Sequence, residues 1–137
     1  MKKIILALLA LFVLSQVSFA VNMGLIGGIR NGLAGGVQVE TGVFPMATFR
    51  GALEAQTGDS SVVLYGGGKF SLPKFPVREP VSLGAGIVSY IGQSNSNVGL
   101  SLSLIFNDLF DSPLFGEVGI DFIKEGRLIA QVGYNIF

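Results

Sequence analysis

The chain has 137 residues, of which 50% are hydrophobic and 13% charged, with nine basic residues, nine acidic residues, no histidine and no cysteine. A balanced charge without a basic stripe gives no footprint for nucleic acid. The missing thiols and imidazoles exclude disulfides, thiolate or histidine-ligated metal, and serine–histidine nucleophile pairs. The length suits one domain.

Residues 1–20 have the pattern of a cleaved Sec-type signal peptide. Lys2 and Lys3 form a positive start, residues 4–14 are apolar, and residues 18–20 read Ser-Phe-Ala, a small-x-small cleavage site. The apolar run is short for a spanning helix, and residues 21–137 contain no second run. An exported, apolar domain over 21–137 without spanning helices favours a closed β-barrel, which satisfies its backbone groups internally in lipid.

A two-residue alternation recurs in eight segments after residue 20. In one of them Leu100, Leu102 and Leu104 alternate with Ser101 and Ser103. Successive strand side chains point to opposite faces, so each segment predicts a strand with one apolar and one small or polar face. The predicted strands lie near 21–29, 33–43, 47–56, 61–72, 81–92, 97–106, 114–123 and 127–136. Each has roughly the nine to eleven residues of a tilted membrane strand.

The connections alternate between two kinds. All five prolines, which mark turns because they cannot donate to a ladder, fall in one kind: Pro45, Pro73, Pro76, Pro80 and Pro113. The other kind is short and rich in Gly, Asn, Asp and Ser, and face parity places it at 30–32, 57–60, 93–96 and 124–126. This segregation predicts an eight-stranded up-and-down barrel with the proline connections and both ends of the barrel chain on one side.

The polar series carries charged residues that would line the lumen if the apolar series faces lipid. This predicted lumen charge network comprises Arg30, Glu40, Arg50, Glu54, Lys69, Glu117 and Asp121. Residues 44–46 as a turn would place Glu40 opposite Arg50. Lys69 and Glu117 should lie at a similar depth, with Glu54, Asp121 and Arg30 nearer the opposite mouth.

An eight-stranded barrel has a lumen just wide enough for side chains to fill, and its charges must pair or be wetted. The sequence therefore predicts a salt-bridged lumen, with a narrow ion or water path as the alternative. Glu117 and Asp121 lie four residues apart on one strand, about 13 Å, too far for a proton-sharing dyad. We expect no catalytic residue, no cofactor site and no metal site.

Two further groups belong to the outward series. Phe49, Phe70, Phe106 and Tyr134 lie toward the proline connections and predict an aromatic girdle at one membrane interface. Glycines recur in the outward phase of the first four strands, at Gly27, Gly35, Gly51, Gly66 and Gly68. They are interpreted as allowing curvature of the sheet. The alternative is a strip for self-association or lipid docking, by analogy with small-residue packing between membrane helices.

The leader, the eight alternating segments and the last strand, 128–137, resemble the small eight-stranded bacterial outer-membrane barrels of the OmpA/OmpX-like group over residues 21–137. A final Phe is similar to the signal that the barrel-assembly machinery reads in that group, which makes Tyr134 and Phe137 a possible assembly signal. Phe137 departs from the usual pattern because it is out of phase with Tyr134 and Ile136. The resemblance implies a bacterial outer-membrane location, outer-membrane lipid and the assembly machinery as partners, and barrel termini facing the periplasm.

The sequence thus predicts a non-catalytic, structural outer-membrane barrel with a polar, side-chain-filled lumen. Three alternatives stay open at this point. One is a narrow ion or water channel, and another is a membrane-binding or self-assembly module that uses the outward glycines. The third is a soluble periplasmic barrel with its leucine-rich faces turned inward around an apolar ligand.

Overall fold

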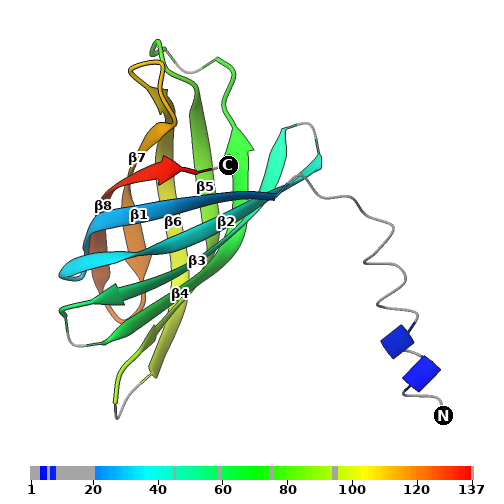
Figure 1. Cartoon of the computed structure of the whole chain (residues 1–137). Coiled ribbons are helices and arrows are strands. Elements are labelled where there is room, and N and C mark those ends of the chain that lie inside the picture. The colour runs from blue at the N-terminus through cyan, green and yellow to red at the C-terminus, as the bar shows by residue number, and fades with distance from the viewer. Residues whose placement is uncertain are drawn as a thin grey trace.

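Eight antiparallel strands close into one barrel in sequence order, with β8 paired back to β1 (Figure 1). The structure is a computed structural model that describes residues 4–5, 7–8, 21–44, 46–58, 60–74, 76–93 and 96–136. The strands are β1 (Val21–Arg30), β2 (Leu33–Phe44), β3 (Ala47–Gln56), β4 (Val62–Ser71), β5 (Val81–Ile91), β6 (Ser96–Leu109), β7 (Leu114–Phe122) and β8 (Gly126–Asn135). The predicted all-β, eight-stranded barrel is confirmed.

Most of the predicted leader lies outside the described residues. Four of its residues are described, and these are helical: Ile4, Ile5, Ala7 and Leu8. Phe137, part of the possible assembly signal, also lies outside the described residues. No helix long and apolar enough to cross a membrane occurs in the part of the chain that the structure describes.

The two kinds of connection lie at opposite ends of the barrel (Figure 1). The β4–β5 and β6–β7 connections, with their prolines, share one end with the start of β1 and the end of β8; we call it the proline end. The β1–β2, β3–β4, β5–β6 and β7–β8 connections lie at the other, the short-loop end.

The strand faces follow the alternation of the sequence. On β6, Leu100 and Leu102 are 63% and 48% exposed, whereas Ser101 and Ser103 are buried. Cross-strand partners lie on the same face of the sheet, so the partners of these residues on the other strands have the same orientation. The apolar series therefore faces outward and the polar series inward.

Three of the predicted hairpin registers are confirmed. Ile29 pairs with Leu33, Ala55 pairs with Val62, and Glu40 lies opposite Arg50. The β1–β2 loop (30–32) needs left-handed backbone at its last two positions. Asn31 has φ of 56° and Gly32 has φ of 128°, values that Asn and Gly tolerate best.

Two predicted registers are wrong by two residues. Ile91 pairs with Ser96, so the β5–β6 loop is 92–95 and not 93–96. Asp121 pairs with Arg127, so the β7–β8 loop is 123–125 and not 124–126. Face parity repeats every two residues along a strand, so it fixes which side a residue faces but leaves slips of two residues undecided.

Candidate functional site

The barrel interior is the site toward which the polar series points. The structure brings all seven residues of the predicted lumen charge network into this interior. Six of them are buried, namely Arg30, Glu40, Arg50, Glu54, Glu117 and Asp121, and the side chain of Lys69 is 13% exposed. They form two clusters around the two arginines.

The Arg30 cluster lies toward the short-loop end. The guanidinium donates to both oxygens of Asp121, from Nε at 2.8 Å and from Nη2 at 3.1 Å, and from Nη1 to Glu54 Oε1 at 2.8 Å. The Tyr90 hydroxyl donates to Asp121, and the Gln131 amide donates to Glu54. Each buried carboxylate therefore faces a cation and at least one further donor, as a buried ion pair requires.

The Arg50 cluster lies toward the proline end. Arg50 Nη2 donates to Glu117 Oε2 at 2.7 Å, and Nε and Nη2 donate to Gln38 Oε1 at 2.8 and 2.6 Å. Glu40, the cross-strand partner, is 3.7 Å from Arg50 Nε and accepts from Lys69 Nζ at 3.2 Å on both oxygens. The nearest carboxylate to Arg50 thus comes from β7, not from the neighbouring strand.

Each charged cluster shares its level of the lumen with an apolar cluster. Toward the short-loop end the buried residues Ala52, Val63, Tyr65, Val88 and Tyr90 pack together, with Ile123 of the β7–β8 loop against them; we call these six residues the short-loop plug. Toward the proline end the cluster is Ile26, Ile105 and Phe115. The Tyr65 ring joins the two levels, since its centroid is 5.6 Å from the Arg30 guanidinium and 5.7 Å from that of Arg50.

Sequence reasoning missed several lumen residues because it considered charged side chains on strands alone. Gln38, Gln131, Tyr65 and Tyr90 lie in the same inward phase as the charges, and that phase could have identified them. It also missed Arg127, whose guanidinium lies 4.7 Å from the centroid of Tyr90. With Arg127, the four cations of the lumen equal its four carboxylates, in the set Arg30, Arg50, Lys69, Arg127, Glu40, Glu54, Glu117 and Asp121.

A polar cavity opens above the Arg50 cluster at the proline end. Its volume is about 570 Å³. Glu40 lines it four residues before the end of β2, with Lys69 bonded to it, and residues of the β4–β5 connection also line it. Amide and hydroxyl side chains from six strands contribute to the wall, at Asn22, Thr48, Ser71, Ser82, Asn107 and Asn135. We call this cavity the vestibule.

The lumen arrangement is suited to holding charges in place. Glu117 and Asp121 belong to different clusters, so they do not form an acid pair. Each lumen carboxylate accepts from a lysine or an arginine, a bond that it would have to give up to face a substrate as a general base. Among the described residues, no group of three or more Asp and Glu side chains is arranged to hold a metal ion.

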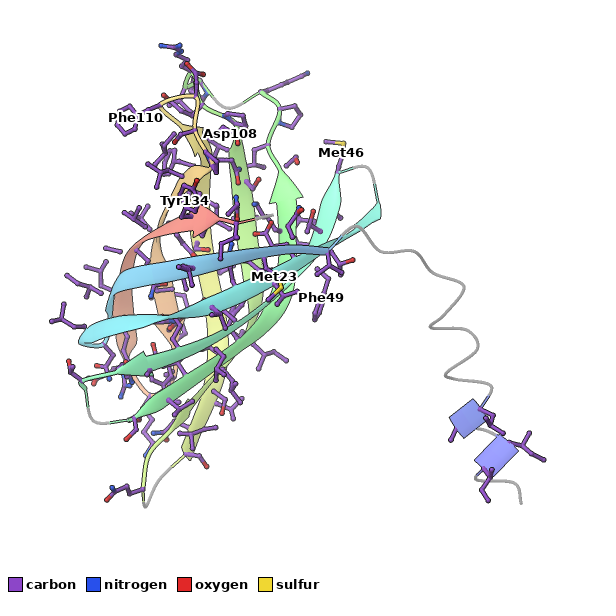
Figure 2. The ribbon with its side chains drawn as sticks, viewed as in Figure 1. Met23, Met46, Phe49, Asp108, Phe110 and Tyr134 are labelled. Carbon is purple, nitrogen blue, oxygen red and sulfur yellow. The ribbon has the colours of Figure 1, made fainter. Side chains whose placement is uncertain are left out.

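The predicted aromatic girdle residues all lie on the outer face. Phe49, Phe70 and Tyr134 are about half exposed, at 52%, 44% and 48%. Phe49 and Tyr134 are labelled in Figure 2. Phe106 is partly buried and pairs with Val81 and Gly116.

The outward glycines form two separate pairs. Gly27 pairs with Gly35, and Gly51 pairs with Gly66. Gly35 also faces Ala55, and Gly51 faces Val39, so the two pairs are offset by four residues along their strands. The Phe70 ring covers Gly68. The expectation of one low strip across four strands is therefore wrong, because the β2–β3 register interposes Val37, Val39 and Leu53.

Comparison with known proteins finds no family model, no curated protein and no solved structure that matches this chain. The function of the barrel therefore has to be inferred from its own geometry.

Proposed function

We propose that the protein is an integral outer-membrane β-barrel of the small eight-stranded kind, with a structural, non-catalytic role. The observation that carries this proposal is the inverted distribution of polarity. Every strand presents large apolar side chains outward that are 40–58% exposed, among them Leu25, Val37, Leu53, Leu64, Ile87, Leu102, Ile120 and Val132. The buried charges of β1, β2, β3 and β7 lie inside.

The outer wall carries almost no charge. Within the strands, every charged side chain except Asp108 follows the inward phase, and Asp108 lies at a register irregularity near the end of β6. Soluble monomers rarely expose a contiguous apolar surface beyond a few hundred Å². A continuous apolar wall around a barrel is typical of a protein solvated by lipid.

The facing of the strands argues against the soluble alternative. A barrel that binds an apolar ligand would turn its leucine-rich faces inward. Leu100 and Leu102 are instead exposed, and Arg50 and Glu54 are buried, which supports the membrane barrel over that arrangement.

The strand lengths fit a bilayer. A ten-residue strand such as β3 is about 33 Å long at about 3.3 Å per residue. A tilt of about 40° reduces its height to about 25 Å, which is the height of the apolar band in outer-membrane barrels. By the resemblance to the OmpA/OmpX-like group, the proline end would face the periplasm and the short loops would face outward.

The side-chain-filled lumen supports a structural role over transport. Two charged clusters and two apolar clusters fill the lumen, with one of each kind toward each mouth. Such a lumen stiffens the barrel by cross-linking strands through its interior, for example β1 to β3 and β7 through Arg30.

Membrane fractionation with gel electrophoresis tests the proposal. The protein expressed with its leader should sediment with outer membranes and resist alkaline extraction. Unheated samples should migrate differently from boiled ones, because a closed barrel stays folded in detergent until it is heated. Recovery in a soluble fraction would contradict the membrane assignment, and steady conductance in planar bilayers would contradict the structural role.

A further inference from the structure

The two mouths of the lumen are built differently. At the proline end the vestibule, about 570 Å³, reaches down to Glu40 and Lys69. Amide, hydroxyl and charged groups make up most of its wall, which water therefore wets readily. A cavity of this size holds many water molecules, since each needs about 30 Å³.

At the short-loop end the short-loop plug fills the lumen beside the Arg30 cluster. Val63, Val88 and Tyr90 are at most 1% exposed, and they come from neighbouring strands, since Val63 pairs with Tyr90. Ile123, the first residue after β7, packs against this cluster. The predicted register places Ile123 in the strand, whereas the observed register, shifted by two residues, places it in the β7–β8 loop.

We propose that the lumen is a one-sided cup, which admits small water-soluble molecules from the proline end as far as Glu40 and Lys69 and is sealed by the short-loop plug. The inference rests on the proposed membrane location, which gives the two ends separate aqueous sides. It adds a direction of access and names the barrier.

The plug is a better seal than the ion clusters for a physical reason. Charged side chains attract water, and Lys69 already shares the vestibule. An apolar constriction expels water, which is how hydrophobic gates stop ions without a steric block. Arg127 lies over the Tyr90 ring, and Val63 is the cross-strand partner of both Glu54 and Tyr90, so the plug fills the part of this level that the Arg30 ion pairs leave open.

Single cysteines test the direction of access, because the chain has no cysteine of its own. Thr48→Cys lies in the vestibule wall, and Val63→Cys lies in the plug. The protein is reconstituted in lipid vesicles with a tag after β8, and protease access to the tag reports which end faces outward. The probe is a small, permanently charged methanethiosulfonate added from outside.

Thr48→Cys should be labelled when the proline end faces outward and protected when it faces inward. Val63→Cys should react about 100-fold more slowly in either orientation, because reaction needs an accessible thiolate. Protection of Thr48→Cys in both orientations, or equal labelling of the two cysteines, would overturn the cup. Failure to insert into vesicles would instead contradict the proposed membrane location, so the two failures are distinguishable.

A matched pair of double variants tests the barrier. Val63→Gly with Val88→Gly removes apolar volume from the plug, and Ile26→Gly with Ile105→Gly removes it from the apolar cluster at the proline end. Folding of each is checked by its gel mobility before and after heating. The plug variant should conduct ions in planar bilayers, and the other variant should stay silent. Equal conductance of both, or silence of a folded plug variant, would overturn the assignment of the seal, and the cysteine measurement stands if either variant fails to fold.

Discussion

The inner and outer walls of this barrel are made from the same strands but differ in polarity and in exposure. On β6 the outward Leu102 is 48% exposed, and the next residue, Ser103, is 5% exposed. Outside, most exposed side chains are apolar and need no hydrogen-bond partner. Inside, Arg30 and Arg50 are each held by carboxylates that come from other strands. The inner wall should therefore respond to the loss of a partner, and the outer wall to the arrival of a charge.

The largest effect is expected inside, at Arg30. Arg30→Met leaves Glu54 and Asp121 as buried carboxylates without a cation. This should lower the free energy of unfolding by about 3–5 kcal/mol. The control is Arg78→Met, which breaks an ion pair with Asp111 whose side chains are more than 80% exposed, and should cost at most about 1 kcal/mol. Urea unfolding in lipid vesicles measures both. Equal costs would mean that the lumen is wetted like the surface.

The next effect is expected on the outer wall, at Leu102. Leu102→Arg should cost about 2–4 kcal/mol, because a cation near the middle of the bilayer loses its hydration. Val77→Arg changes an equally exposed apolar residue, 43% against 48%, in the β4–β5 connection and should change stability by at most about 0.5 kcal/mol. If both variants unfold at the wild-type urea concentration, the outer wall faces water.

A double-mutant cycle sharpens the account of the inner wall. Arg50 lies 2.7 Å from Glu117 and 3.7 Å from Glu40. The coupling between Arg50→Met and Glu117→Gln should be about 1–3 kcal/mol, as for side chains in contact. Glu40→Gln should couple less strongly to Arg50→Met, because Glu40 keeps Lys69. A larger coupling for Glu40 would show that the cross-strand pair dominates over the pair across the lumen.

Two adjacent glycines of β4, the outward Gly66 and the inward Gly67, allow the two walls to be compared at neighbouring positions. A Cβ at the inward Gly67 would stand 2.5 Å from the Gly86 Cα and 2.7 Å from the Tyr65 hydroxyl, whereas one at the outward Gly66 meets nothing within 4 Å. Gly67→Ala should therefore cost about 1–3 kcal/mol through overpacking. Gly66→Ala should change stability by about 0.5 kcal/mol or less. Thermal unfolding followed by gel mobility ranks the two, and a reversed order would place the lumen on the wrong side of β4.

Much of this architecture could be predicted from the sequence because it depends on local rules. The face of each strand follows from a two-residue period, and the turn at 30–32 follows from Asn31 and Gly32, which tolerate left-handed backbone. The β5–β6 and β7–β8 registers could not be predicted in the same way, since a slip of two residues leaves every side chain on its face.

The ion-pair partners inside the lumen also could not all be predicted from the sequence. Glu40 was expected beside Arg50 because neighbouring strands determine that contact. Glu117 reaches Arg50 from β7, across the barrel, and such a contact depends on how far the strands are staggered on closure. Arg127 is the first residue of the predicted strand 127–136. A charged residue at that position is typical of a loop, so the sequence alone does not assign it to the lumen.

The central claim is that lipid, not water, surrounds the outer wall, and quenching of a single tryptophan tests it most directly. The chain has no tryptophan, so Leu102→Trp and Val77→Trp each carry one probe. In vesicles of lipids brominated near the bilayer centre, the fluorescence of Leu102→Trp should be strongly quenched and that of Val77→Trp should not. Equal, weak quenching of both in folded protein would contradict a barrel that spans the bilayer.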